Sequence, residues 1–375
     1  MIYLDNAATT KPCGEACEAV ASAMRERFGN ASSLHKMGVL SEQIIVSAKK
    51  TLLTALASSP SPVGKAPLDG EIYFTSGATE SNNTAILGAC RAYRRLGNKI
   101  VSTAMEHPSV ARVLDRLEQE EGFEVVRLAP KDYDDFEQAL AEQVDGNTLL
   151  VSCMAVNNET GFCVDVKGLY RLVKRKNEKT LVHIDAVQGF LKTPLCGDFI
   201  SISGHKIHAC KGIGALYVKK GVRLSPLLLG GGQQKNMRSG TEPVELIAGL
   251  EAAVKAYHAA HEHFEELKRR PLSRLAQMDD IAINSDERCV ANIINFSVRG
   301  VRSEIMLHSL EEDEIYVSSG SACSRGKKSS VPAALGISDS DADCAVRVSL
   351  CAETTESDID ALCDKIEKTI ERVRR

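Results

Sequence analysis

The chain has 375 residues, of which 43% are hydrophobic and 26% charged, and its formal net charge is −4. This composition is typical of a globular protein that is long enough for two domains. The slight negative charge does not favour a nucleic acid or an anionic membrane as a partner. No stretch approaches the roughly 20 apolar residues of a membrane span, and an acid, Asp5, stands where a basic and apolar leader would begin. We therefore expect a cytoplasmic protein.

The chain contains twelve cysteines, a high number, spread from Cys13 to Cys363 without a Cys-x-x-Cys pair. In a chain with no export signal, we expect most of them to be reduced thiols packed as small apolar side chains. Because the spacing typical of metal ligands is missing, no metal site is predicted.

The first half of the chain alternates between short apolar strands and amphipathic helices. After an extended start over residues 3–10, helices are expected at 15–27 and 41–57. Strands and helices then alternate, with strands at 71–74, 99–102, 124–128, 148–153 and 181–184 and helices at 81–96, 109–120, 134–143 and 166–176. This alternation predicts an α/β fold with a mostly parallel sheet covered by helices on both faces. In such folds, ligands bind beyond the carboxyl ends of the strands.

The sequence of the second half of the chain predicts two more strands of the same sheet, followed by a smaller α/β unit. Strands at 199–202 and 214–218 flank a turn, and a long helix from 244 to about 268 leads out of the sheet. The smaller unit is expected to contain strands at 281–284, 291–297, 315–317 and 345–350, a helix at 303–310 and a terminal helix from about 356. We expect a large domain over 14–260 and a small domain made of 1–13 and 261–375.

The turn between the last two strands of the large domain reads Ser203-Gly204-His205-Lys206. A lysine held between two strands can be partly desolvated, which lowers its pKa and frees the amine to attack a carbonyl. Ser203 and His205 can donate hydrogen bonds to an anion. Taken alone the motif is weak, because most lysines beside glycine turns point into water.

Two further motifs follow strands and begin helices. Around Gly77, free N–H groups at a helix start could bind an anion, or Ser76 or Thr79 could simply cap the helix. His107, just before Pro108, could stack on a flat ring and move protons, or it could be an ordinary residue at a helix start.

Two more polar motifs stand at strand ends. Asn157 and Asn158 could orient a carboxylate or a ring oxygen, although an Asx turn is the simpler interpretation. Asp185, if buried, requires a cationic partner such as a pyridinium nitrogen; the alternative is a helix N-cap. A lysine, an anion-binding turn, an imidazole and a carboxylate together fit pyridoxal phosphate.

The chain resembles the NifS/IscS-type cysteine desulfurases, in the class V branch of the fold-type I pyridoxal-phosphate enzymes. The resemblance runs nearly end to end and is carried by motifs at residues 3–10, 75–81, 106–108, 156–161, 203–206, 237–241 and 318–324. It implies a large domain with a mostly parallel, seven-stranded-type sheet and a smaller C-terminal α/β domain. It also implies pyridoxal phosphate as cofactor and a homodimer.

The resemblance implies a role for each site residue. Lys206 would form the Schiff base with the cofactor aldehyde and later carry a proton, and Asp185 would keep the pyridine nitrogen protonated. Gln188 would bond the phenolic oxygen of the ring, and His107 would stack on the ring and assist proton transfer. The phosphate would be held by Ala78, Thr79, Ser203, His205 and, across the dimer, Thr241.

The substrate groups are implied in the same way. Asn157 would contact the cofactor and, with Arg347, grip the carboxylate of L-cysteine, a task for which the planar guanidinium is suited. Cys323 lies in a polar stretch, residues 318–330, that predicts an exposed loop. Cationic neighbours such as Arg325 favour its thiolate, although an incidental surface cysteine is the alternative.

By the resemblance, the Cys323 thiolate takes the sulfur of bound L-cysteine, which leaves a persulfide and releases L-alanine. The persulfide sulfur would pass to an acceptor protein, either an iron–sulfur scaffold or a tRNA-thiolation enzyme. A selenocysteine lyase or another enzyme of the same branch, and a non-catalytic sulfur-relay protein, remain alternatives. The thiol at Cys323 argues against a simple aminotransferase.

The chain departs from the family pattern at several places. His208-Ala209-Cys210 stands where relatives often have Tyr-Gly-Pro, Cys351-Ala352 replaces Gly-Arg, and Ser330-Val331-Pro332 replaces His-Val-Leu. The sequence stops at Arg375, without the extension that some relatives use to dock a scaffold protein. The identity of the sulfur acceptor is therefore left open.

Overall fold

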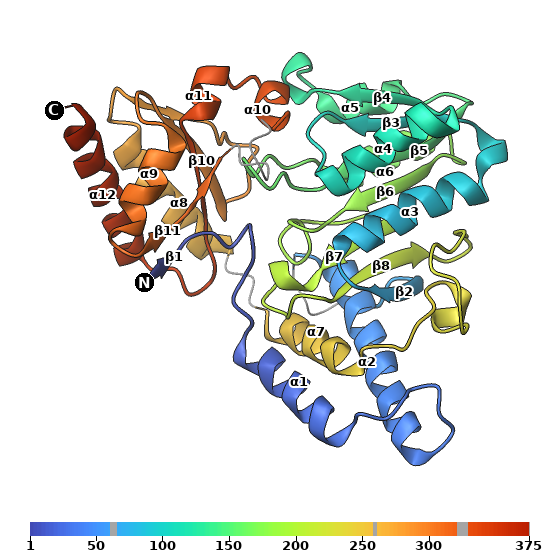
Figure 1. Cartoon of the computed structure of the whole chain (residues 1–375). Coiled ribbons are helices and arrows are strands. Elements are labelled where there is room, and N and C mark those ends of the chain that lie inside the picture. Colours follow the sequence, from blue (N-terminus) through green and yellow to red (C-terminus); the bar gives the residue numbers. More distant parts are fainter. Residues whose placement is uncertain (61–65, 258–260, 321–328, 375) are drawn as a thin grey trace.

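The structure is a computed structural model that describes residues 1–60, 66–257, 261–320 and 329–374. Figure 1 shows a large sheet with helices on both sides and, beside it, a smaller unit that contains the last third of the chain and the N-terminal strand. None of the described helices is long and apolar enough to cross a bilayer.

The large sheet has seven strands and is almost entirely parallel, as predicted. Only β8 runs antiparallel to its neighbours, β2 and β7. The order across the sheet is β2-β8-β7-β6-β5-β3-β4. The strands are β2 (Gly70–Thr75), β3 (Lys99–Thr103), β4 (Glu124–Leu128), β5 (Thr148–Met154), β6 (Leu181–Asp185), β7 (Phe199–Ser203) and β8 (Gly214–Lys219). The carboxyl ends of β5, β6 and β7 therefore lie side by side, which is where ligands bind in such sheets.

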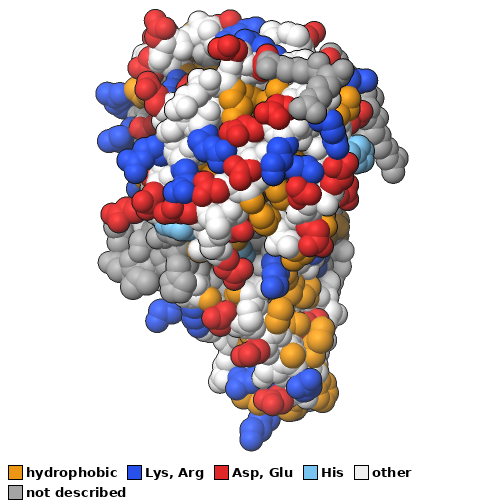
Figure 2. Space-filling view, turned by 90° about the vertical axis from the view of Figure 1, so that its left-hand side faces the viewer, with side chains coloured by type: hydrophobic (Ala, Val, Ile, Leu, Met, Phe, Trp, Pro, Cys, Tyr) orange, Lys and Arg blue, Asp and Glu red, His pale blue; other side chains and the backbone are white. Residues whose placement is uncertain are grey.

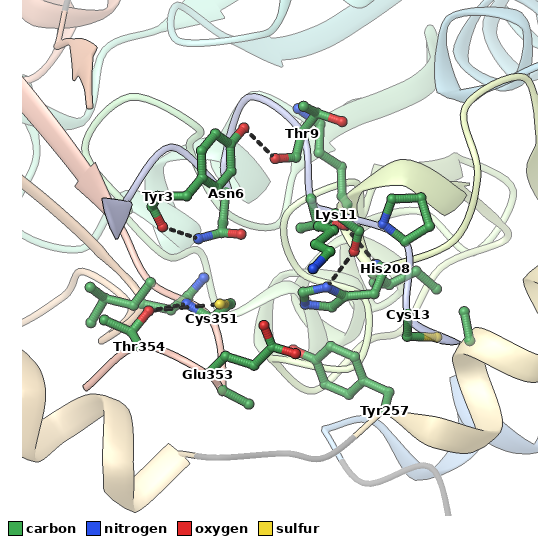
Figure 3. Close-up of a pocket in the computed structure, with 18 of the residues that line it drawn as sticks. Tyr3, Asn6, Thr9, Lys11, Cys13, His208, Tyr257, Cys351, Glu353 and Thr354 are labelled. Atoms are coloured by element: carbon green, nitrogen blue, oxygen red, sulfur yellow. Dashed lines mark hydrogen bonds between the residues drawn. The ribbon is translucent and has the colours of Figure 1, made fainter. Parts of the chain in front are cut away.

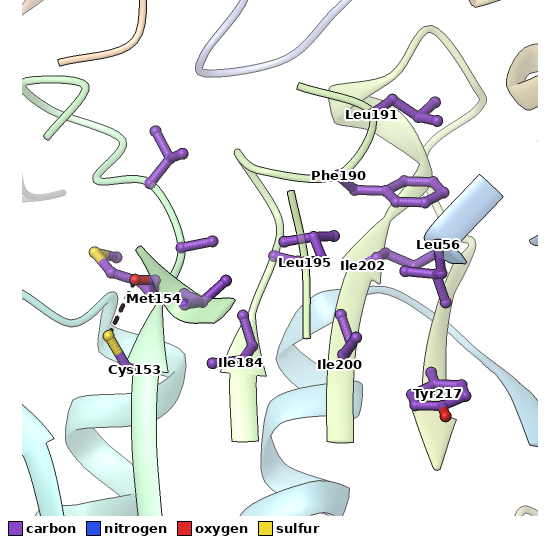
Figure 4. Packing of buried hydrophobic residues seen from close by; sticks show 14 of the residues in the cluster. Leu56, Cys153, Met154, Ile184, Phe190, Leu191, Leu195, Ile200, Ile202 and Tyr217 are labelled. Atoms are coloured by element: carbon purple, nitrogen blue, oxygen red, sulfur yellow. Dashed lines mark hydrogen bonds between the residues drawn. The ribbon is translucent and has the colours of Figure 1, made fainter. Parts of the chain in front are cut away.

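Two hydrophobic cores cover the two faces of this sheet because successive side chains of a strand point to opposite faces. On one face, Ile200 and Ile202 pack with Leu56 and Phe190 (Figure 4). On the other, Phe199 packs with helices α3 (Ala78–Ala92) and α4 (Pro108–Glu121). The first face is covered by α1 (Gly14–Glu26), α2 (Lys36–Ser58), α5 (Phe136–Glu142), α6 (Val166–Lys176) and α7 (Val244–Ala256).

The smaller unit is built on a four-stranded antiparallel sheet of order β12-β13-β10-β9. Its strands are β9 (Ile281–Ile283), β10 (Ile293–Val298), β12 (Ser318–Ser319) and β13 (Ala345–Ser349). Helices α8 (His261–Leu275), α9 (Ser303–Glu311) and α12 (Glu356–Arg374) supply its core. On the face shown in Figure 2, acidic and basic side chains are intermingled; in α8 and α12, Arg270 pairs with Asp360 and Arg274 with Asp364.

The N-terminus joins this smaller unit. β1 (Ile2–Tyr3) pairs with β11 (Ile315–Tyr316), and Leu4 lies in the core of the small sheet. We propose the division into a large domain, 14–260, and a small domain, 1–13 with 261–375. The separate hydrophobic core of the small sheet supports this division.

Two predicted elements are wrong in part. The helix predicted from 244 to about 268 is two helices, α7 and α8, because Tyr257 leaves the helical conformation (φ −65°, ψ 120°). The apolar side chains of α7 pack on the large sheet and those of α8 on the small one, so the chain changes cores at this point. The extended start is also interrupted, since residues 6–8 form a turn after β1. The short elements β12, α10 (Val331–Ala334) and α11 (Asp339–Asp343) were not predicted.

Candidate active site

Lys206 ends a short helical turn that directly follows β7. Its ammonium donates hydrogen bonds to the backbone carbonyls of Ala7, at 2.5 Å, and Ala8, at 2.7 Å. Burial, together with the positive charges of Arg347 and Lys192, lowers the pKa of Lys206 to about 7, while the charges of Asp5 and Asp185 oppose that shift. The amine therefore loses its proton near neutral pH, as a nucleophilic lysine must. The turn over residues 6–8 is what presents the two carbonyls to the amine.

Asp185 is the last residue of β6 and is 4% exposed. Its Oδ2 accepts a hydrogen bond from Asn82 Nδ2 at 2.8 Å, and its Oδ1 accepts one from the Val187 N–H at 3.0 Å. Burial raises the pKa of Asp185, while the hydrogen bonds and the charges of His107 and Lys206 oppose that rise. In the described part of the chain the carboxylate has no ion-pair partner, so a pyridinium nitrogen would stabilise its charge.

His107 is connected to Asp185 through polar side chains. Its Nδ1 accepts from the Ser109 N–H at 3.1 Å and lies 2.8 Å from Ser109 Oγ. The same hydroxyl accepts a hydrogen bond from Asn82 Nδ2 at 2.9 Å. With Nδ1 acting as an acceptor, the neutral ring carries its proton on Nε2. The residue is partly accessible to solvent, while desolvation by the surrounding protein lowers the pKa of His107.

The predicted anion-binding turn lies at the start of α3. Gly77 is its N-cap, with a φ of +154°, and no side chain caps the helix. The first N–H groups of α3, including those of Ala78 and Thr79, are thus available to a ligand. The predicted alternative, a cap from Ser76 or Thr79, is not observed.

Ser203 is brought to this turn by a close contact between backbones. Ser203 pairs with Gly214 across β7 and β8, and a Cβ at Gly214 would lie 2.7 Å from Gly77 Cα. Only glycine permits this approach. His205, two residues after Ser203, lies 3.2 Å from Thr9 Oγ1 through its Nδ1, and burial lowers its pKa to about 4. The ring is therefore neutral at physiological pH and can donate a single hydrogen bond.

Gln188 lies beside the lysine contact. Its Nε2 donates to the carbonyl of Ala7 at 2.9 Å, the same carbonyl that receives Lys206. Its Oε1 is buried without a hydrogen-bond partner among the described residues. Because an unsatisfied buried polar atom is costly, this oxygen suits contact with a bound polar ligand.

Arg347, in β13, is 6% exposed and held at both terminal nitrogens. Its Nη2 donates to Asp5 Oδ1 at 2.6 Å and its Nη1 to the carbonyl of Asn158 at 2.9 Å. Its Nε is buried and lacks a partner among the described residues. The guanidinium is thus fixed in orientation, and its Nε–H has no partner among the described residues.

Asn157 adopts the simpler of its two predicted roles. Its Oδ1 accepts from the N–H groups of Glu159, at 2.9 Å, and Thr160, at 3.0 Å, and its Nδ2 donates to the Met105 carbonyl at 3.2 Å. The side chain has no exposed surface. It stabilises an Asx turn, and its contact with cofactor and substrate stays a prediction.

Two predicted residues remain, Thr241 and Cys323. Thr241 is exposed on the chain between β8 and α7, and its loop is tied to the start of α3 by the Arg238–Glu80 ion pair, at 2.9 Å. Cys323 lies outside the described residues. Gly320 and Ser329 are the described residues that flank its segment.

A cavity of about 770 Å³ lies next to Lys206, between the N-terminal segment and the chain that follows β13 (Figure 3). Its lining includes Lys206 but neither His107 nor Asp185, so it is not the strand-end cluster itself. Three residues that depart from the family pattern line it: His208, Cys351 and Ala352. These three departures therefore fall around one cavity, whereas Ala209, Cys210 and the residues 330–332 do not line it.

Several residues of this site were not predicted from the sequence. Asn82 and Ser109 connect Asp185 to His107, and Asp5 orients Arg347. Asn82 carries a weak signal, because it is a polar residue on the buried side of the helix that the anion-binding turn begins. The pairing of Asp5 with Arg347 has no local signal, since the two residues are far apart in the sequence.

Comparison with known proteins gives the family. The family model described as aminotransferase class-V matches residues 2–362. A cysteine desulfurase IscS of Klebsiella pneumoniae subsp. pneumoniae is 36% identical over 398 aligned positions, which cover 100% of this chain and 93% of that protein. The chain belongs to the NifS/IscS-type cysteine desulfurases of aminotransferase class V. The predicted family, enzyme class and pyridoxal-phosphate dependence are thereby confirmed.

Solved structures of the desulfurase family and its neighbours agree in fold. A structure described as a NifS-like protein superposes with a TM-score of 0.87 at 34% identity and covers 99% of both chains. A structure of SspA in complex with cysteine superposes with a TM-score of 0.78 at 29% identity and covers 93% of this chain and 99% of that one. The predicted α/β fold of the fold-type I enzymes is confirmed.

Proposed function

We propose that this chain is a cysteine desulfurase that uses pyridoxal phosphate to remove sulfur from L-cysteine, leaving L-alanine and a persulfide on Cys323. The observation that carries the proposal is the amine of Lys206. Burial brings its pKa to about 7 at the strand ends, near a buried, unpaired Asp185 carboxylate. The cofactor, when bound, supplies an aldehyde for the substrate amine and a ring that accepts electrons.

The described residues fit this cofactor. Asp185 would carry the charge opposite the ring nitrogen, and the unpartnered Oε1 of Gln188 marks a buried polar position beside Lys206. His107, which is accessible to solvent, would stack on the ring. The phosphate would lie at the start of α3, held by Ala78, Thr79, Ser203 and His205, with Thr241 supplied by a second copy of the chain in a homodimer. The exposure of Thr241 in a single chain supports this last assignment.

The substrate would be held by its carboxylate. Arg347, with its unpartnered Nε, would donate to that carboxylate, and Asn157 would keep the neighbouring turn in place. L-cysteine is favoured as the substrate because a related protein has been solved in complex with cysteine.

Sulfur transfer needs one thiolate and one proton carrier. The Cys323 thiolate forms a new S–S bond to the substrate sulfur while the C–S bond of the substrate breaks. The electron pair of that bond stays with carbon, which takes a proton and leaves as alanine. Lys206, with a pKa of about 7, can hold or release that proton near neutral pH. L-cysteine and a thiol thus give alanine and a persulfide, with atoms and electrons balanced.

The surroundings of the enzyme are part of the same proposal. We place it in the cytoplasm, where the persulfide would pass to an acceptor protein, either an iron–sulfur scaffold or a tRNA-thiolation enzyme. No membrane or nucleic-acid contact is needed for this step.

The test is mass spectrometry of the holoenzyme after incubation with L-cysteine, together with a measurement of alanine. We expect one additional sulfur on the peptide that contains Cys323, with alanine formed. Cys323→Ala should abolish both, whereas Cys210→Ala, which removes the thiol nearest to Lys206 in sequence, should abolish neither. A persulfide confined to another cysteine, or alanine formation that survives in Cys323→Ala, would refute the proposal.

A further inference from the structure

Glu159 lies in the turn between β5 and α6; it contacts Ser329 directly and is linked to Gly320 through Asn295. Its carboxylate Oε1 accepts a hydrogen bond from Ser329 Oγ at 2.7 Å. Its backbone carbonyl accepts one from Asn295 Nδ2 at 2.8 Å, and the same nitrogen lies 3.4 Å from the carbonyl of Gly320. Glu159, in the turn after β5, is therefore linked to the described chain on either side of the segment that contains Cys323.

The same turn is joined to the arginine of the site. Arg347 Nη1 donates to the carbonyl of Asn158, and Asn157 Oδ1 accepts from the Glu159 N–H. Across the small sheet, Ser318 pairs with Arg347, two residues before Gly320. Glu159 thus connects the residue proposed to hold the substrate carboxylate with the flanks of the segment that carries the thiol.

The carboxyl group of Glu159 is buried and only partly hydrogen-bonded. The residue is 8% exposed, and its Oε2 is buried without a hydrogen-bond partner among the described residues. Burial raises the pKa of Glu159 to about 7, against the hydrogen bond from Ser329 and the charge of Arg347. Burying such a group costs stability unless its contacts compensate. Among the described residues, the one partner of the carboxyl group is Ser329, so holding Ser329 is the role that these contacts indicate.

We propose that Glu159 is a positioning residue, which fastens Ser329 and thereby fixes the approach of Cys323 to the substrate held at Arg347. This inference rests on the proposed function, since it takes Cys323 as the group that accepts sulfur. It adds a residue that acts through another residue and touches neither cofactor nor substrate.

The experiment compares Glu159→Ala, Ser329→Ala, the double variant and Glu159→Gln, all as holoenzyme. Ser330→Ala is the matched control, because the neighbouring hydroxyl makes only a 3.4 Å contact with the Ala104 carbonyl. Two rates are measured after mixing with L-cysteine: the change in cofactor absorbance, which reports substrate binding, and persulfide formation on Cys323 by quenched mass spectrometry.

We expect Glu159→Ala and Ser329→Ala each to slow persulfide formation about tenfold, the effect of one lost buried hydrogen bond. The double variant should be no slower than the slower single variant, because both changes break the same contact. Glu159→Gln keeps an acceptor oxygen for Ser329 and should restore most of the rate. The absorbance change should be as fast as in the unaltered protein throughout, and Ser330→Ala should match it in both rates.

Additive losses, or an equal slowing of the absorbance change, would overturn the inference, because they indicate a general disturbance of the site. If Glu159→Ala does not fold, Ser329→Ala alone tests the inference. A normal rate of persulfide formation in Ser329→Ala would also overturn it. Failure of the proposed function would give a different result: the unaltered protein itself would form no persulfide on Cys323. Both proposals would then be wrong.

Discussion

The strand-end cluster of Lys206, Asp185 and His107 and the junction around Arg347 are assembled in different ways. The cluster comes from the carboxyl ends of neighbouring parallel strands, each followed by its own short motif. At the junction, Arg347, near the end of the chain, donates both to Asp5, near its start, and to the carbonyl of Asn158. The first region depends on local sequence and sheet order, whereas the second exists only once the small unit has packed beside the large sheet.

The two regions also differ in how their charges are satisfied. Asp185 is buried and Lys206 is half-buried, and their desolvation shifts the pKa of each group toward its neutral form. Arg347 instead has a carboxylate partner at 2.6 Å. A cluster that shifts protonation is suited to chemistry, and a paired, fixed cation is suited to binding. Substitutions in the first should therefore affect turnover, and those in the second substrate affinity.

The largest effect is expected for Lys206→Ala. Removing the amine removes both the attachment to the cofactor and the proton carrier, so alanine formation should fall by at least about a thousandfold. The measurement is the rate of alanine release, with the absorbance of the bound cofactor as a second readout. Lys211→Ala removes an exposed lysine that lines the same cavity and should have little effect. Comparable losses in the two variants would contradict the role of Lys206.

Arg347→Lys should separate binding from chemistry. A lysine cannot bond both Asp5 and the Asn158 carbonyl and still offer a donor in a fixed direction. We expect KM for L-cysteine to rise about tenfold or more, with a smaller change in kcat. Arg299→Lys, which alters the ion pair between Arg299, just after β10, and Asp341 in α11, serves as the control. A fall in kcat with unchanged KM would place Arg347 in the chemical step.

Asn82→Ala tests the connection between Asp185 and His107. Its hydrogen bond lowers the pKa of Asp185, so its loss should raise that pKa and move the acid limb of the kcat profile to higher pH. Leaving buried partners unpaired should also cost about 1–3 kcal/mol of stability. Both are measurable, by a pH–rate profile and by urea unfolding. In Asn83→Ala, the neighbouring control, an unshifted profile is expected; equal shifts would argue against the connection.

The smallest effect on activity is expected at Glu106, where the prediction concerns the pH dependence of stability. Burial raises the pKa of Glu106 from 4.5 to about 8. Between those values the folded state keeps a proton that the unfolded state has released, so stability falls as pH rises, by up to about 1.4 kcal/mol per pH unit. Glu106→Gln, which is neutral throughout, should show a shallower fall between about pH 5 and about pH 8 in urea unfolding. The exposed Glu18→Gln should keep the original slope, and an unchanged slope in Glu106→Gln would contradict the burial argument.

Much of the large sheet was predictable because its signals are local. β4 and α6 have the predicted bounds, and the other strands of the large sheet differ from prediction by a residue or two at their ends. The mostly parallel pairing follows from the alternation with helices, whereas the order of the strands was not predicted. The break between α7 and α8 was missed, because the helical pattern continues through residues that pack on two different cores.

The sequence by itself determined the chemical groups: a lysine after a strand, an acid at the end of another, a glycine turn before a helix, and a cysteine in a polar segment. Only the tertiary structure decided their state. The lowered pKa of Lys206, the neutral His205 and the orientation of Arg347 by Asp5 all depend on desolvation and contacts between distant residues. Desolvation is a property of the folded interior, which no local stretch of sequence specifies.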